Sequence, residues 1–202
     1  MADDEVERPE QGDSPGYERA LAFSDGVFAI AITLLVLGVA VPEVADDRLA
    51  HALSKLGPQA LSYFVGFAVM GLFWLDHNRL FARLRVFDAT LLKLNLGYLS
   101  LISLMPFTTG VFGRYGGVSI AVALYAANVA ATSLSSVAMR VFAEHRGLVA
   151  PSRERPALWH SLLPSAIFLV SIPVAFVDAH VAPFLWLGLL ATGFARRAQE
   201  QG

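Results

Sequence analysis

The stretch RALAFSDGVFAIAITLLVLGVAVP, residues 19–42, places one carboxylate near the start of an otherwise apolar run. Between Arg19 and Pro42 the only polar side chains are Ser24, Asp25 and Thr33. About 20 apolar residues suffice for a helix to cross the hydrocarbon core of a bilayer. An ionisable residue in such a span costs roughly 2.5–3.5 kcal/mol on insertion scales, so it tends to face protein or water. Asp25 is therefore the first candidate for a structural or functional role.

Composition indicates a membrane protein. The 202 residues are 55% hydrophobic, with a mean hydropathy of +0.56. Several runs are long enough to span a bilayer, so we expect an all-α, polytopic membrane protein. The first run follows acidic rather than basic residues, and we expect it to be retained as a helix instead of cleaved as a signal peptide. The absence of cysteine excludes disulfides, thiolate metal sites and cysteine nucleophiles.

The apolar runs predict six membrane helices. They cover about Tyr17 to Val41, Pro58 to Phe81, Asp88 to Val111, Val118 to Phe142, Ala157 to Val177 and Val181 to Ala195. Residues 43–57 predict a short amphipathic helix at the membrane surface. We expect residues 1–16 to form a disordered acidic cytoplasmic tail, residues 17–197 the six-helix transmembrane domain, and residues 198–202 a cytoplasmic C-terminal tail.

Lys and Arg are distributed unevenly between the two predicted faces. An even number of spans puts both termini on one side, and that side, with helix ends, holds 12 of the 15 Lys and Arg residues. They are Arg8, Arg19, Arg79, Arg83, Arg85, Lys93, Arg140, Arg146, Arg153, Arg155, Arg196 and Arg197. Because cytoplasmic loops are enriched in Lys and Arg, this bias predicts that both termini are cytoplasmic in an inner-membrane protein.

An apolar stripe runs along the first predicted helix, opposite Asp25. At about 100° per residue, Ile30, Leu34, Leu37 and Val41 fall between roughly 120° and 180° from Asp25, and Thr33 lies at the edge. The carboxylate should therefore point toward other helices of its own subunit. The identity of these residues does not distinguish lipid contact or bundle packing from a ring of Leu that closes a pore.

The second predicted helix offers partners for Asp25 in FWLDHNRLF, residues 73–81. Both helices carry their polar residues at the cytoplasmic end, so Asp25 and His77 should lie at similar depth. A hydrogen bond from His77 or Asn78 would satisfy the buried carboxylate. Such a cluster more commonly forms a structural clamp that performs no chemistry.

Two other functions use the same residues. A proton-coupled secondary transporter could titrate Asp25 and His77 within the membrane. An intramembrane hydrolase would need His77 to bridge Ser24 and Asp25, which are about 100° apart on the helix, and this arrangement is unfavourable. The remaining histidines show no metal-ligand spacing, so we expect no fixed metal site and no cofactor. Asn95, Asn128 and the hydroxyl residues of the fourth helix are expected to form interhelical hydrogen bonds.

The signature Arg19, three residues, then Phe23-Ser24-Asp25 resembles the RxxxFSD motif of the lysosomal and bacterial potassium channel family typified by human transmembrane protein 175. The segment FWLDHNRLF, with Trp74 and His77, is similar to the second helix of that family. One departure is Gly26, where alanine is common. The resemblance implies that four six-helix subunits assemble into a homotetramer. It also implies a potassium channel rather than an enzyme. The channel would be surrounded by membrane lipid and would have no nucleic-acid partner.

The resemblance also implies roles for individual residues. Its pore isoleucine corresponds to Ile30, further apolar constrictions to Leu34 and Leu37, and its pore threonine to Thr33. The permeant ions would be potassium and other monovalent cations. Arg19, Phe23, Ser24, Asp25, Trp74, His77 and Asn78 would form the signature and its structural clamp.

The charge bias yields a topology prediction. Because loops 42–57 and 110–117 should lie outside the cell, Ser54→Cys should react with an impermeant maleimide in intact cells, and Ser152→Cys should not. The native chain has no cysteine and serves as the unlabelled control. Labelling at position 152 but not at position 54 would reverse the predicted orientation.

Overall fold

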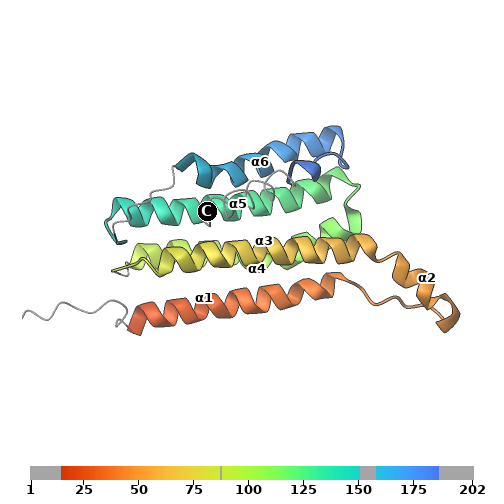
Figure 1. Ribbon diagram of the computed structural model, residues 1–202, viewed down its shortest axis with the longest axis horizontal. Coiled ribbons are helices and arrows are strands. Elements are labelled where there is room, and N and C mark those ends of the chain that lie inside the picture. Colours follow the sequence, from red (N-terminus) through yellow and green to blue (C-terminus); the bar gives the residue numbers. More distant parts are fainter. Residues whose placement is uncertain (1–14, 87, 151–157, 187–202) are drawn as a thin grey trace, which may run out of the picture.

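The computed structural model describes residues 15–86, 88–150 and 158–186 and shows an all-α bundle (Figure 1). The long helices are α1 (Pro15–Leu34), α3 (Gly57–Phe81), α4 (Ala89–Tyr115), α5 (Ser119–His145) and α6 (Leu158–Val177). Four described segments are long and apolar enough to cross a membrane: Gly16–Gly38 and the whole of α3, α4 and α5. Together they make this a multi-pass membrane protein.

Most predicted helices lie where the sequence placed them. The second, third, fourth and fifth predicted helices correspond to α3, α4, α5 and α6, although α4 extends four residues beyond the predicted end at Val111. The predicted surface helix is also present, as the 3₁₀ turn η2 (Asp46–Arg48) followed by α2 (Leu49–Ser54), neither of which buries a residue. The sixth predicted helix, Val181 to Ala195, lies mostly outside the described residues, as do the two predicted tails.

The end of the first predicted helix is wrong. α1 ends at Leu34, continues as the 3₁₀ helix η1 (Leu35–Gly38), and residues 39–45 are not helical. Gly38 lies so close to α4 that a Cβ atom there would be 3.3 Å from the Cα of Gly110. A tighter helix at this point is typical of a helix end.

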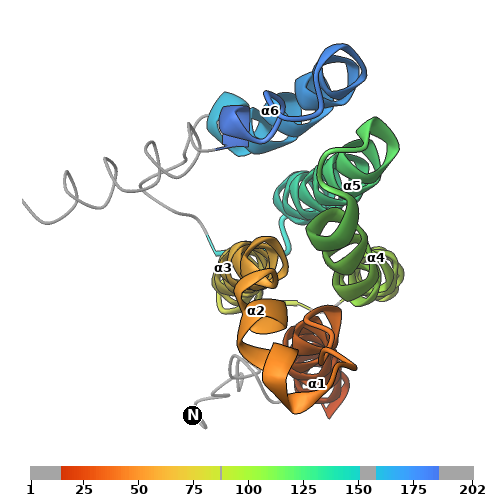
Figure 2. The same cartoon turned by 90° about the vertical axis from the view of Figure 1, so that its right-hand side faces the viewer.

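α1 and α6 lie on opposite sides of the bundle, with α3, α4 and α5 between them (Figures 1 and 2). α4 is central, because it packs against α1, η1, α3 and α5, whereas α6 packs against α5. At the start of α4, Asp88 accepts hydrogen bonds from the backbone N–H groups of Thr90 and Leu91, and these bonds lower the pKa of its carboxyl group. Asp88 is therefore the N-cap of the central helix.

Two loops are joined at the end of the bundle where α3 and α5 end. Leu84 and Val149 form an antiparallel β-bridge, with hydrogen bonds from Arg85 N to Leu148 O at 2.8 Å and from Ala150 N to Arg83 O at 2.8 Å. The bridge fixes the backbone of residues 83–85 against the loop after α5.

Gly66 allows α3 to approach α4 and η1 closely. A Cβ atom at this position would lie 2.7 Å from Thr109 Cγ2 and 3.2 Å from Leu35 Cδ2. Small residues of this kind let membrane helices pack backbone against backbone.

Gly66→Ala should therefore destabilise the bundle by about 1–3 kcal/mol, the usual cost of overpacking a core. Gly71→Ala on the same helix is the matched control, since nothing lies within 4 Å of its added Cβ. The measurement is the midpoint of thermal unfolding in detergent, followed by tryptophan fluorescence. An equal midpoint for the two variants would show that the close approach at Gly66 does not constrain α3.

Candidate functional site

α1 buries one side within the bundle and leaves its apolar opposite side uncovered by the described part of the chain. The buried residues follow helical spacing and are Ala20, Ser24, Phe28 and Ala31, followed by Leu35 at the start of η1. The side chains of Ile30, Leu34 and Leu37 are 62, 42 and 74% exposed. The predicted stripe thus faces away from the subunit, where lipid or another copy of the chain can contact it.

The change from α-helix to 3₁₀ helix brings Leu37 into line with Leu34. Residues three apart eclipse one another in a 3₁₀ helix, which turns about 120° per residue. A continuous α-helix, at about 100° per residue, would separate these two side chains by about 60° around the axis. Val41 follows the helical segment and is not part of the stripe.

Three further residues of the predicted site, Thr33, Phe23 and Arg19, lie on the exposed side of α1. The hydroxyl of Thr33 donates to the carbonyl oxygen of Ile30 at 2.8 Å, beside the stripe. Phe23, which the family resemblance places in the clamp with Ser24 and Asp25, is 55% exposed. Arg19 is exposed and forms no ion pair with a described residue.

Asn95 on α4 connects α1 and α3 through buried hydrogen bonds. Its amide nitrogen donates to Ser24 Oγ at 3.0 Å, and its amide oxygen lies 2.9 Å from His77 Nε2. Ser24 in turn donates to the carbonyl oxygen of Ala20 at 2.8 Å. The expectation that Asn95 forms interhelical hydrogen bonds is confirmed. Because Ser24 is fully buried and bonded in this way, it is not positioned as a nucleophile.

His77 is enclosed by aromatic rings. It stacks on Phe81 with 4.1 Å between ring centroids and on Tyr98 with 5.7 Å, and Phe28 lies against its edge. Since an amide oxygen only accepts hydrogen bonds, His77 Nε2 carries the proton. His77 Nδ1 has no partner among the described residues. A neutral imidazole suits this site, because a charged ring would bury a second N–H group without an acceptor.

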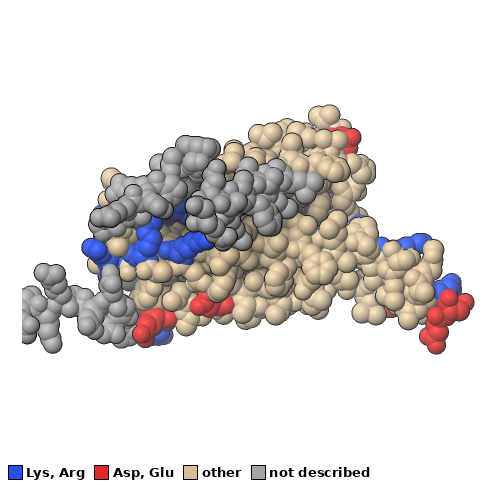
Figure 3. All heavy atoms as spheres, viewed as in Figure 1, with Lys and Arg blue, Asp and Glu red and all other residues tan. Residues whose placement is uncertain are grey.

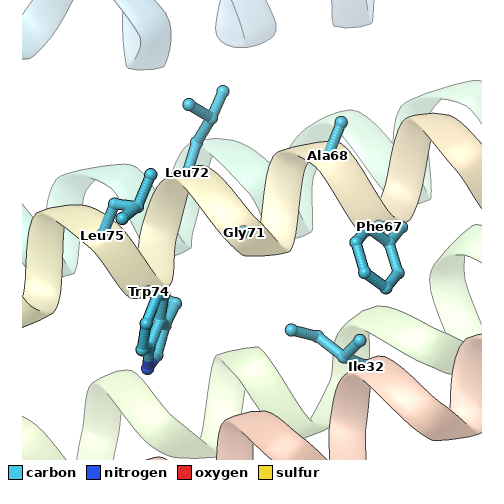
Figure 4. A pocket seen from close by; sticks show the side chains of 7 residues that line it. All are labelled: Ile32, Phe67, Ala68, Gly71, Leu72, Trp74 and Leu75. Atoms are coloured by element: carbon cyan, nitrogen blue, oxygen red, sulfur yellow. The ribbon is translucent and has the colours of Figure 1, made fainter.

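The hydrogen-bond partner of Asp25 differs from the prediction. Trp74 Nε1 donates to Asp25 Oδ1 at 3.0 Å, whereas His77 bonds to Asn95 instead. Asn78 makes no side-chain hydrogen bond to a described residue. The prediction of a bond from His77 or Asn78 to Asp25 is therefore wrong. Trp74 projects from α3 with its indole nitrogen at the far end of the side chain (Figure 4).

A separate apolar pocket of about 410 Å³ lies between α1 and α3. Figure 4 shows its lining residues, which are Ile32, Phe67, Ala68, Gly71, Leu72, Trp74 and Leu75. Ile32 belongs to this pocket and is half-buried, so it lies on a different side of α1 from the exposed stripe.

An ion pair between two of the apolar helices is not among the residues predicted from the sequence. Asp76 on α3 pairs with Arg140 on α5 and also accepts a hydrogen bond from Ser136 at 2.7 Å. The available signal was that Asp76 is the only acidic residue of α3 and Arg140 the only Lys or Arg of α5, because a charge within an apolar helix usually requires a partner.

Known proteins resemble this chain along most of its length. The family described as "Endosomal/lysosomal potassium channel TMEM175" matches residues 19–106. A potassium channel of Streptomyces collinus is 34% identical over 182 residues, covering 86% of this chain and 88% of that protein. The human endosomal/lysosomal proton channel TMEM175 is 38% identical over 109 residues, which cover 48% of this chain and 22% of that protein.

The fold is also found in solved structures. The crystal structure of a lysosomal potassium-selective channel TMEM175 homolog from Chamaesiphon minutus superposes with a TM-score of 0.76 at 26% identity. The match covers 91% of this chain and 98% of that one.

The buried network predicts that Asn95 matters more for stability than Asp25. Asn95→Ala removes one hydrogen-bond partner from Ser24 and one from His77. Each buried polar group left without a partner should lower the free energy of unfolding by about 1–3 kcal/mol. Asp25→Asn retains a side-chain oxygen that accepts from Trp74, so the loss should be smaller. The thermal unfolding midpoint in detergent tests this order, with Asn78→Ala as the control. A midpoint for Asn95→Ala equal to that of Asn78→Ala would contradict the role given to Asn95.

Proposed function

The chain belongs to the TMEM175 family of potassium channels, which are not enzymes, and from this membership we propose that it conducts potassium passively through a pore built by four copies. The pore would be lined by the exposed side of α1 from each copy. The observation that supports this most directly is the apolar stripe of Ile30, Leu34 and Leu37, which no described part of the subunit covers. We also propose that the channel lies in the cell membrane with both termini in the cytoplasm.

Apolar rings would act as the gate. Four copies of each stripe residue around one axis give a narrow constriction without dipoles that could replace the hydration shell of an ion. Such a constriction closes by losing water and conducts when it widens enough to stay hydrated. Because Leu34 and Leu37 lie in line, they would form two successive rings beyond the ring of Ile30.

Selectivity would rest on pore width and on the hydroxyl of Thr33. That hydroxyl donates to the carbonyl oxygen of Ile30, so its oxygen is the group left to contact an ion. No carbonyl or acidic ring is apparent along the stripe. We therefore expect a modest preference for potassium, with other monovalent cations also permeating.

Asp25, Ser24 and His77 would hold α1 in the orientation that the pore needs. The contacts from Trp74 to Asp25 and from Asn95 to Ser24 join α1 to α3 and α4. A proton-coupled transporter using Asp25 and His77 is less well supported, since the two side chains belong to separate hydrogen bonds. Flux that follows the potassium gradient without coupling to a proton gradient would distinguish the channel from the transporter.

The test of the pore is Ile30→Asn. Four amides in place of four branched alkyl groups should keep the constriction hydrated, so potassium flux into liposomes should rise at equal protein content. Ile32→Val is the matched control, because Ile32 lies in the pocket between α1 and α3 and should leave flux nearly unchanged.

Lipid contact at Ile30 predicts a different result. A polar Asn facing hydrocarbon would reduce insertion or stability and leave conductance unaltered. Unchanged flux from a well-folded Ile30→Asn protein would remove Ile30 from the pore and with it the proposed gate.

A further inference from the structure

A second pocket, of about 440 Å³, lies at the end of the bundle where α3 and α5 finish. Its lining is strongly basic and consists of Asp76, Arg79, Leu80, Ala82, Arg83 and Arg140. Among the described residues that line the pocket, three guanidinium groups and one carboxylate give a formal charge of +2. Figure 3 shows Lys and Arg side chains gathered at this end of the molecule.

Two of the three arginines of the pocket, Arg83 and Arg140, are held by the surrounding structure. Asp76 pairs with Arg140, and Ser136 bonds to the second oxygen of Asp76, which fixes the orientation of the Arg140 side chain. The carbonyl oxygen of Arg83 accepts from Ala150 N at 2.8 Å, and its guanidinium lies 3.4 Å from the Ala150 carbonyl oxygen. Groups that are ordered before a ligand arrives lose less entropy on binding.

The pocket lies near one end of the helices that are long and apolar enough to cross a membrane. Arg79 is in the last turn of the span formed by α3, and Arg83 follows directly after it. Arg140 is five residues before the end of α5, which corresponds to about 7–8 Å along the helix axis. The apolar Leu80 and Ala82 line the same pocket as the charged groups. Basic pockets between membrane helices at this level are suited to acidic lipid headgroups.

We propose that this pocket binds a phosphate-bearing anion, in the first instance the headgroup of an anionic phospholipid. Guanidinium groups match the geometry of phosphate oxygens and can donate two hydrogen bonds to them. Arg79 forms no ion pair with a described residue, so its donors can face the ligand. Asp76 and Arg140 would position the site, and Arg79 and Arg83 would supply most of its attraction.

The experiment is a titration of the purified protein, in nonionic detergent, with dioleoyl phosphatidylglycerol, followed by the rise in thermal unfolding temperature. We expect Arg79→Gln/Arg83→Gln to raise the apparent Kd by about tenfold for each guanidinium removed. The control is Arg85→Gln/Lys93→Gln, which removes the same charge near the same end but outside the pocket, and it should bind nearly as tightly as the unmodified protein. Arg79→Lys/Arg83→Lys keeps the charge without the planar fork and should give an intermediate Kd.

Other probes identify the source of the phosphate. Dioleoyl phosphatidylcholine, which is zwitterionic, should stabilise all variants equally and weakly. Stabilisation by inorganic phosphate that disappears in the Arg79/Arg83 variant would support the site but assign it to a soluble anion. If that double variant aggregates, the single exposed substitution Arg79→Gln provides the same comparison. The proposal would be overturned if Arg79→Gln/Arg83→Gln and Arg85→Gln/Lys93→Gln bound phosphatidylglycerol with equal affinity. It would also be overturned if neither phosphatidylglycerol nor inorganic phosphate raised the unfolding temperature.

Discussion

The buried amide of Asn95 is the interaction on which the arrangement of α1 depends. Inside a bilayer there is no water to satisfy a polar group, so Ser24 and His77 must find partners within the protein. Asn95 serves both and thereby ties α1 and α3 to the central helix α4. Once Ser24 faces α4, the rest of α1 follows: Phe28, Ala31 and Leu35 are buried, and the apolar stripe faces outward.

Ion pairs and hydrogen bonds between side chains also join α3 to α5 and α5 to α6. Asp76 joins α3 to Arg140 and Ser136 of α5, and Ser165 of α6 donates to Ser133 of α5 at 2.7 Å. Helices in lipid gain little from hydrophobic burial against each other, so close packing and hydrogen bonds decide how they associate. Gly66 provides the packing where α3 crosses α4 and η1.

One short segment of α3, residues 74–79, reaches three different neighbours. Trp74 bonds to Asp25 of α1, His77 to Asn95 of α4, and Asp76 to Arg140 of α5. Arg79 then lines the basic pocket. A change in the position of this segment would therefore act on the proposed pore helix and on the proposed lipid site together, which connects the two through a rigid helix.

The sequence alone located the four described segments that can cross a membrane and the exposed side of α1, because hydropathy and a 3.6-residue period are properties of a single helix. It did not determine that Trp74 would bond to Asp25 or that Leu35–Gly38 would tighten into a 3₁₀ helix. These features depend on the rotation and axial offset of one helix against another. A shift by one residue moves a side chain about 1.5 Å along the axis and 100° around it, which is enough to exchange one hydrogen-bond partner for another, so only the packed bundle decided them.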